Sequence, residues 1–478
     1  MANGIQKMID RFGGARDMTT GDPAKCLIEF ALPLLIGNIA QQLYSTVDSI
    51  VVGKYAGDNA LGAIGATMPM FNLIFVLFMG ISVGAGILVS QYYGAKDKKR
   101  LSQTVGNSLI MVAVVSLIIM VVGSIIVRPF MVFLNTPPEL YDMAVDYLTI
   151  LLLGVAGTTY YNILSGILRG IGDSFMPLVF LLVCTIINTI LDIILVGPMH
   201  LGVTGAALAT VLAQIISSIL CYLRIAKMKG TFTLDREAFR VDFRLIKHLL
   251  VLGIPTGVTQ MIFSLASIMV QSLTNNFGAM IVTVNSIIMR VDGFAMMPNF
   301  TFGSTMTTYA GQNVGALKIK RLHDGTREGM KMSLVVSTVL VAVILLIGKL
   351  LMGLFTNTQE IIDYAYHMMC ILAAGYIGMA VTQMLSGVMR GAGDTMTPMW
   401  ISIITTVVIR VPLAYLMAYM TRSEAYPNGD PKTLFISLLI SWIAGAVLTA
   451  VLYMRRGWAK HARVGGNVID ISQMGDAE

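Results

Sequence analysis

Long apolar runs alternate with short polar segments along the whole chain. Each run is long enough to cross a bilayer, whose hydrocarbon core takes about 20 helical residues. The first half contains six of these segments, near 26–53, 60–93, 103–127, 140–168, 174–196 and 203–226. The second half contains six more, near 245–270, 279–309, 330–354, 361–389, 395–420 and 433–454. The pattern predicts an all-α polytopic membrane protein with twelve transmembrane helices.

Polar segments divide these helices into two groups of six. The longest polar stretch runs from Arg224 to His248 and follows the sixth apolar segment. We therefore expect a cytoplasmic N-terminal segment, an N-lobe, a cytoplasmic linker, a C-lobe and a cytoplasmic tail, spanning residues 1–25, 26–227, 228–244, 245–456 and 457–478.

The two halves are copies of each other. Residues 164–177 return as residues 385–398 at an offset of 221, with eight of 14 positions identical. At the same offset the turn 91–95 matches 312–316 in Gln, Gly and Ala. Six spans per copy give both copies the same orientation, so the repeat axis lies along the membrane normal, as in transporters that rock two lobes about a central cavity. A duplicated scaffold without transport is the alternative.

Composition supports a membrane protein and excludes several other classes. Of 478 residues, 56% are apolar and only 12% are charged, against about 25% charged in soluble domains. This excludes a soluble enzyme, a nucleic-acid-binding module and a secreted disulfide scaffold. The four cysteines lie far apart and form no metal or disulfide pattern, so we expect no cofactor.

The distribution of positive charge predicts the orientation. If the N-terminus is inside, the inner segments carry 26 of the 33 basic residues and the outer loops carry five. Cytoplasmic loops are enriched in Lys and Arg, so we expect both termini to be cytoplasmic. The net charge of +7 then reflects topology, and we expect no nucleic-acid partner.

Two carboxylates of the first copy lie inside predicted spans. Asp48 lies five residues before Gly53, where the first span ends, and Asp192 lies five before Gly197, where the fifth span ends. At 1.5 Å per residue, each is expected ~7–8 Å inside the outer end of its helix. Ionisable groups within a membrane are costly and therefore mark candidate functional sites.

Two neutral side chains are expected at a similar depth. Asn188 precedes Asp192 by one helical turn, and Thr210 lies seven residues into the sixth span. Oxygen ligands suit Na⁺, and two neighbouring carboxylates would also hold a proton. Asn and Thr in spans also tie helices together, so for them that alternative stays open.

The second copy offers a different set of ionisable groups. Arg290 and Asp292 lie in the eighth span and Arg410 in the eleventh. With Asn162 of the fourth span, they are candidates for lining a cavity or for bridging helices, and the pattern does not choose between these roles. The five histidines are scattered without metal-ligand spacing.

Together these motifs resemble the multidrug and toxic compound extrusion (MATE) family. The resemblance rests on the run 43–53 after Pro33, on the paired Gln-x-x-Gly-Ala and Arg-Gly-x-Gly-Asp turns, and on the run 205–210. It covers residues 20–456 and implies two six-helix bundles that open alternately to each side.

Within the family, the chain is similar to the DinF-like branch. That branch carries an acid in the first span, Asn-x-x-x-Asp in the fifth and Thr in the sixth, which here are Asp48, Asn188, Asp192 and Thr210. The backbone carbonyl of Ala206 is a further ligand that the resemblance implies. The NorM-like branch also uses acids in the seventh and tenth spans, whereas residues 263–271 and 376–387 of this chain contain no carboxylate.

From this resemblance we expect a multidrug efflux antiporter of the cell membrane. It would exchange H⁺ or Na⁺ for amphipathic, cationic organic compounds, as a monomer in the lipid bilayer. A flippase for a lipid-linked precursor is the alternative, although it would need several cationic side chains in its cavity and only Arg290 and Arg410 are available. A major-facilitator transporter also has twelve spans, but residues 94–100 of this chain do not match the Asp-Arg-rich turn that follows its second span. No nucleophile or metal constellation supports a membrane enzyme.

Overall fold

The computed structural model describes residues 14–134, 136–228, 230–424, 426–460, 462–464 and 467–471. The side chains of residues 45–50, 58, 73, 77, 463, 464, 467 and 468 are outside that description.

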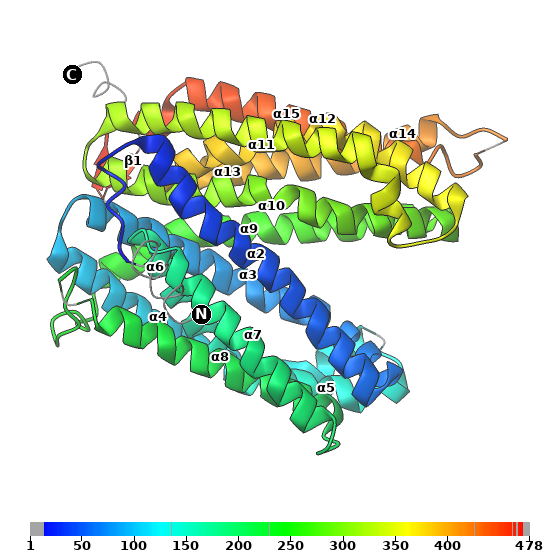
Figure 1. The fold of residues 1–478 in the computed structure, drawn as a ribbon, viewed down its shortest axis with the longest axis horizontal. Coiled ribbons are helices and arrows are strands. Elements are labelled where there is room, and N and C mark those ends of the chain that lie inside the picture. The colour runs from blue at the N-terminus through cyan, green and yellow to red at the C-terminus, as the bar shows by residue number, and fades with distance from the viewer. Residues whose placement is uncertain are drawn as a thin grey trace. The chain divides into compact units, whose positions relative to one another are not determined.

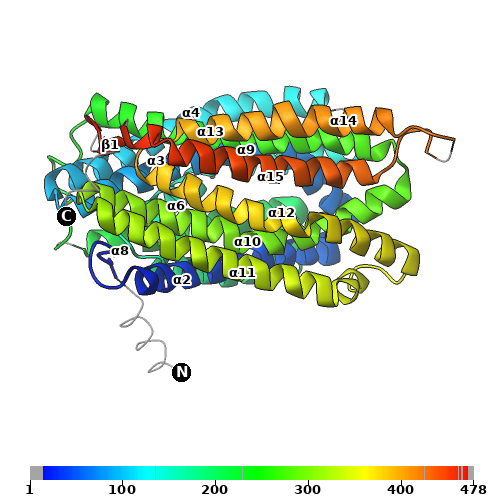
Figure 2. The ribbon, with the colours of Figure 1, turned by 90° about the horizontal axis from the view of Figure 1, so that it is seen from above.

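Helices form almost all of the described chain (Figures 1 and 2). In the first half they are α2 (Pro23–Ala56), α3 (Asp58–Gly94), α4 (Lys98–Phe133), α5 (Pro138–Leu153), α6 (Val155–Gly170), α7 (Phe175–Val196) and α8 (Gly202–Ala226). In the second half they are α9 (Phe243–Asn275), α10 (Ala279–Gly315), α11 (Ile319–Gly353), α12 (Gln359–Gly391), α13 (Met396–Ser402), η1 (Ile403–Arg410), α14 (Val411–Met420), α15 (Lys432–Met454) and α16 (Gly457–Lys460). A short antiparallel hairpin of β1 (Ala462–Val464) and β2 (Asn467–Ile469) follows.

The predicted membrane-spanning pattern is confirmed. Eleven helical segments of the described residues are long and apolar enough to cross a membrane, and the bent pair α5–α6 supplies a twelfth when it is counted as one span. The chain is therefore a multi-pass membrane protein of the all-α class.

The fourth span differs from the single helix expected over 140–168. It is broken between α5 and α6, whose axes differ by 50°. Gly154 lies at the break, where a Cβ atom would collide with the side chain of Val211 from α8. Only glycine leaves room for this close approach, so the bend places α8 directly against the break.

The eleventh span also departs from a regular α-helix. Residues 403–410 form a π-helix between α13 and α14, and the Val411 N–H bonds to the Thr406 carbonyl five residues earlier. Pro412 follows in the first turn of α14 and cannot donate the backbone hydrogen bond that would continue an α-helical register. Arg410 is the last residue of this π-helix.

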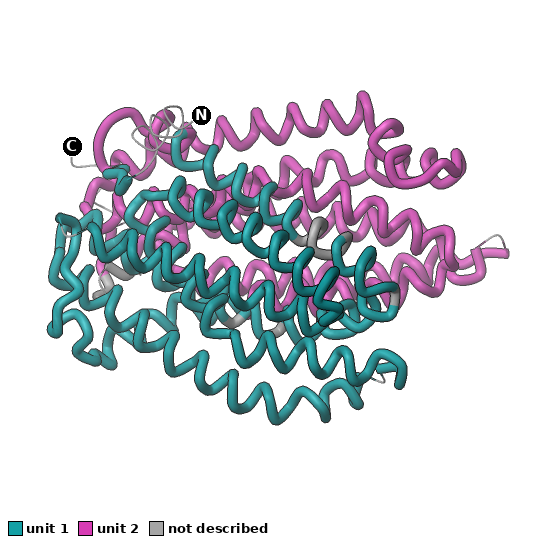
Figure 3. The backbone as a smooth tube through the Cα atoms, turned by 60° about the horizontal axis from the view of Figure 1, so that its bottom comes forward, with its two compact units in different colours: residues 1–18, 29–257 teal, residues 19–28, 258–478 magenta. Residues whose placement is uncertain are grey.

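The chain divides into two compact units (Figure 3). Unit 1 comprises residues 1–18 and 29–257, and unit 2 comprises residues 19–28 and 258–478. The boundary on the second-half side falls within α9, between Gly257 and Val258.

In unit 1, α6 packs against both α3 and α8, and α7 packs against α8. The segment between α8 and α9 belongs to the same unit, where Asn107 of α4 holds it in place. The Asn107 amide donates to the Arg240 carbonyl at 3.1 Å and accepts from the Asp242 N–H at 2.8 Å. Phe232 of this segment is buried in the apolar core. The segment is therefore an integral part of unit 1.

In unit 2, α12 is the central helix and packs against α10, α11 and α15. Its apolar core includes Met368, Leu372 and Tyr376, whose side chains are fully buried. Apolar side chains are therefore buried along much of α12.

The duplication seen in the sequence returns as duplicated local geometry. Lys96 and Leu317 adopt left-handed backbone conformations with φ of 58° and 57° at equivalent turns. Asp173 accepts a hydrogen bond from the Met176 N–H, and Asp394 from the Thr397 N–H, both at 3.0 Å. The paired aspartates therefore begin α7 and α13 in the same way, as expected for residues that satisfy free N–H groups at a helix start.

Candidate functional sites

Asn188 and Asp192 of α7 and Thr210 of α8 form the candidate site of unit 1. Asn188 is 1% exposed and Asp192 is 0% exposed, and the two side chains lie one turn apart on the same helix face. The Asn188 amide nitrogen donates to the Thr210 hydroxyl at 3.4 Å. The structure therefore brings together two of the predicted residues from different helices, with the buried carboxylate beside them.

An amide oxygen of this site lacks a hydrogen-bond donor. The Asn188 Oδ1 atom is buried and has no partner among the described residues. A buried polar atom without a partner costs about 1–3 kcal/mol, so such an atom in a native structure calls for an explanation. An oxygen atom that faces no donor is suited to coordinate a cation.

Sequence reasoning missed one further polar residue of α8. Gln214 lies one turn after Thr210 and on the same face, and its Oε1 atom is also buried without a partner among the described residues. Ala206 lies one turn before Thr210 and is buried. Glutamine carries no charge, and Gln214 lies far from the carboxylates in the sequence. Neither its residue type nor its spacing therefore marked it as a site residue.

The remaining first-copy candidates are Asp48 and Asn162. Asp48 lies on α2, but its side chain is outside the described residues. Asn162 lies on α6, where its amide donates to the Thr158 carbonyl of the same helix at 2.7 Å. The structure therefore gives the Asn162 side chain a hydrogen bond within its own helix, and none to Asn188 is found among the described residues.

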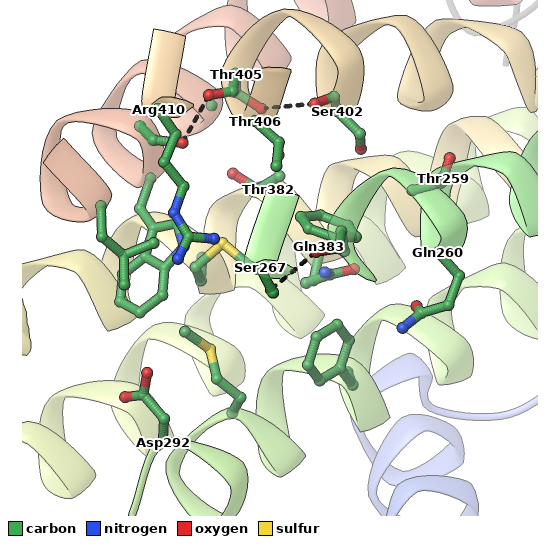
Figure 4. A pocket seen from close by; sticks show the side chains of 18 of the residues that line it. Thr259, Gln260, Ser267, Asp292, Thr382, Gln383, Ser402, Thr405, Thr406 and Arg410 are labelled. Atoms are coloured by element: carbon green, nitrogen blue, oxygen red, sulfur yellow. Dashed lines mark hydrogen bonds between the residues drawn. The ribbon is translucent and has the colours of Figure 1, made fainter. Parts of the chain in front are cut away.

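Unit 2 contains a cavity of about 300 Å³ (Figure 4). Its lining combines apolar side chains such as Met289, Phe300 and Trp442 with neutral polar ones such as Gln260 and Thr406. Three ionisable side chains join this lining, namely Asp292 of α10, Arg390 in the last turn of α12 and Arg410 of η1. In Figure 4 Arg410 and Asp292 extend into the same space, Arg410 from η1 and Asp292 from α10.

Asp292 is held by a network that the sequence did not reveal. The Tyr376 hydroxyl of α12 donates a short hydrogen bond to the Asp292 Oδ1 atom. The Tyr376 carbonyl accepts from the Asn299 amide at 3.1 Å, and the Asn299 Oδ1 atom accepts from the Ser337 hydroxyl at 2.8 Å. This chain of bonds fixes the direction in which the carboxylate points.

Arg410 and Arg290 differ in their surroundings. Arg410 is partly buried, and its Nε atom is fully buried without a partner among the described residues. Arg290 is exposed and is absent from the cavity lining. The structure thus brings Asp292 and Arg410 to one cavity and leaves Arg290 outside it.

The polar sites of the two units are not equivalent. At the offset of 221, Asn188 and Asp192 correspond to Ile409 and Leu413, both apolar. Conversely, Asp292 corresponds to Phe71. The scaffold is duplicated, but these ionisable groups are not, so the two units differ in the chemistry of their polar side chains.

Within the described residues, no group of three or more His, Cys, Asp or Glu side chains could hold a metal ion. The site formed by Asn188, Asp192 and Thr210 instead offers oxygen atoms of one amide, one carboxylate and one hydroxyl, drawn from α7 and α8. Such a set suits a hard monovalent cation.

A duplicated bundle of membrane-spanning helices with buried ionisable side chains in both units defines a membrane transporter. The sequence model of the MatE family matches the chain twice, over residues 33–194 and 255–416. The chain therefore belongs to the MATE family, whose members are transporters and not enzymes.

Several curated proteins are similar along most of the chain. The Bacillus subtilis protein named "Probable multidrug resistance protein YoeA" is 29% identical over 420 residues, covering 86% of this chain and 91% of that protein. The Thermotoga maritima protein named "Probable multidrug resistance protein NorM" is 25% identical, covering 92% and 94%. The Escherichia coli DNA damage-inducible protein F, DinF, is 28% identical over 350 residues, covering 72% and 75%.

Solved structures share the fold. An outward-facing multidrug resistance MATE family transporter superposes with a TM-score of 0.85 at 23% identity, covering 92% of this chain and 97% of that one. A Pyrococcus furiosus transporter of the MOP superfamily gives a TM-score of 0.84 with the same coverage and identity. These likenesses confirm the predicted fold of two six-helix repeats.

Proposed function

We propose that this protein is a secondary active multidrug efflux antiporter of the cell membrane. It exports amphipathic organic compounds in exchange for H⁺ or Na⁺, with both termini in the cytoplasm. The names of its relatives as multidrug resistance proteins support the substrate class. The excess of basic residues in the predicted inner segments supports the orientation.

The coupling cation binds in unit 1 at Asn188, Asp192 and Thr210, together with the Ala206 carbonyl. The single observation that carries this proposal is the buried Asn188 Oδ1 atom, which meets no donor from the described residues and lies one turn from a fully buried carboxylate. A cation here would satisfy that oxygen and neutralise Asp192. Asp48 is included in this site because of its predicted depth in the first span.

Cation binding drives export by shifting a conformational equilibrium. A ligand shifts two states only by its difference in affinity for them. An ion that binds unit 1 more tightly in one state favours that state, and release of the ion on the other side resets it. Because the ion moves down its gradient, the bound organic compound can move up its own.

A reconstituted system tests the antiport mechanism. Liposomes that contain the purified protein are loaded with ethidium, an amphipathic cation. An inward Na⁺ gradient at equal pH, or an inward proton gradient at equal Na⁺, is then imposed. We expect one of the two gradients to accelerate ethidium release several-fold over symmetric buffers. If neither gradient accelerates release, the antiport proposal is wrong.

Thr210→Val tests the ligand set against a matched threonine. We expect the ion concentration that gives half-maximal ethidium release to rise roughly two- to tenfold, because one oxygen contact worth about 0.5–1.5 kcal/mol is lost. Thr185→Val of α7 is the control, since its hydroxyl already donates to the Leu181 carbonyl of its own helix at 2.9 Å. Equal behaviour of the two variants would remove Thr210 from the site.

A further inference from the structure

Arg410 lines the cavity of unit 2 but forms no ion pair with a described residue. Five ion pairs are found among the described residues, and none includes Arg410. Its Nε atom is buried and makes no hydrogen bond to a described residue. Burying an arginine without an acceptor is costly, so an anionic group that enters the cavity would find a strong and directional donor.

Asp292 provides the opposite charge at the same cavity. One of its oxygen atoms accepts from Tyr376, and the described residues supply no donor to the other. The network through Tyr376, Asn299 and Ser337 holds the carboxylate in place. A cationic group in the cavity would therefore meet an acceptor that is already oriented.

Asp292 and Arg410 line the same cavity, which Arg390 also lines, without forming an ion pair with each other. No nitrogen of Arg410 lies within 4.0 Å of an Asp292 oxygen, since this pair is absent from the ion pairs of the described residues. A purely cationic ligand would leave Arg410 uncompensated, and a purely anionic ligand would leave Asp292 uncompensated. A ligand with both charges satisfies both side chains.

The rest of the lining defines the body of this ligand. Met289, Phe300, Met379 and Trp442 contribute apolar surface, and methionine side chains adapt to varied shapes. A volume of about 300 Å³ lies at the lower end of the range for small-molecule sites, roughly 300–1,000 Å³. The cavity therefore suits a compact amphipath with an aromatic or aliphatic body.

We propose that the cavity of unit 2 binds an amphipathic zwitterion, with its carboxylate on Arg410 and its protonated amine on Asp292. This inference rests on the proposed export function and names a substrate class for it. It differs from the cationic class expected from the resemblance alone. Arg410 is the residue that selects for the carboxylate, and Tyr376 positions Asp292.

Three dansyl probes with the same body but different charges test this proposal. Nε-dansyl-lysine is a zwitterion, its methyl ester is a cation, and its Nα-acetyl derivative is an anion. Binding to the purified full-length protein in detergent is followed by dansyl fluorescence. We expect the wild type to bind the zwitterion roughly ten- to a hundredfold more tightly than either derivative, as for loss of one charged hydrogen-bonding partner.

Substitutions assign each charge to its residue. Arg410→Gln should make the zwitterion and the methyl ester bind equally, and Asp292→Asn should make the zwitterion and the acetyl derivative bind equally. Arg410→Lys should restore part of the preference for the carboxylate, because it keeps the charge but loses the planar donor geometry. Arg327→Gln is the control, since Arg327 is an exposed arginine of α11 that does not line the cavity.

The three probes are first compared on the wild-type protein alone, so this test does not depend on whether a variant folds. If the methyl ester binds as tightly as the zwitterion there, or if Arg410→Gln keeps the wild-type preference, the proposal is overturned. The assay uses no ion gradient, so its outcome is separate from that of antiport. Gradient-driven ethidium release without zwitterion binding would overturn only this inference, and zwitterion binding without gradient-driven release would overturn only the antiport mechanism.

Discussion

Asp192→Asn is expected to abolish the acceleration of ethidium release by an imposed ion gradient. The side chain keeps its shape but loses the charge that the cation neutralises in the buried site. Loss of a charge-assisted contact of about 1.5–3 kcal/mol weakens ion binding roughly ten- to a hundredfold. At the same ion concentration, the site that is occupied in the wild type is then mostly empty in the variant. Release from liposomes under the effective gradient measures the loss.

Ethidium exchange separates coupling from substrate passage. With ethidium on both sides and no ion gradient, we expect Asp192→Asn to exchange labelled for unlabelled ethidium as the wild type does. Asp48→Asn should behave like Asp192→Asn. Asp146→Asn is the matched control, because Asp146 is an exposed aspartate of α5 in the same unit. Gradient-driven release that persists in Asp192→Asn would refute the assignment of the coupling site.

Periodicity and composition predicted the membrane-spanning segments and their duplication, but not two local distortions. The break at Gly154 depends on Val211 of α8, which lies far away in the sequence. The π-helix over 403–410 is followed by Pro412, and the effect of a proline on a helix ranges from a kink to a change of register. Both distortions are set by the packing of neighbouring helices, which a one-dimensional pattern does not contain.

The parts of the candidate sites that lie on one helix could be predicted from residue type and helical spacing. A carboxylate and an amide four residues apart, Asp192 and Asn188, identified the buried face of α7 from the sequence alone. Contacts across helices were harder to predict. The bond from Tyr376 to Asp292 and the buried oxygen of Gln214 depend on how each helix is rotated about its axis. Neutral residues in apolar segments give no signal of that rotation.

Gly170→Val and Gly391→Val should each prevent the correct packing of one unit. These glycines occupy equivalent positions of the repeat, at the ends of α6 and α12. A Cβ atom at Gly170 would lie 2.7 Å from the Gly86 carbonyl oxygen of α3, and one at Gly391 would come closer than 3.0 Å to the Thr307 carbonyl oxygen of α10. Neither backbone atom can move aside as a flexible side chain would.

The expected destabilisation reaches or exceeds the roughly 1–3 kcal/mol typical of overpacked cores. The yield of monodisperse protein in detergent and the midpoint of thermal unfolding measure it. Gly65→Val of α3 and Gly293→Val of α10 are matched controls, because a Cβ atom at either position meets nothing within 4 Å. Since each helix pair is built from a copy of the same sequence motif, both substitutions should act alike. If Gly391→Val unfolds with the wild-type midpoint, the close approach of α12 to α10 is not what holds unit 2 together.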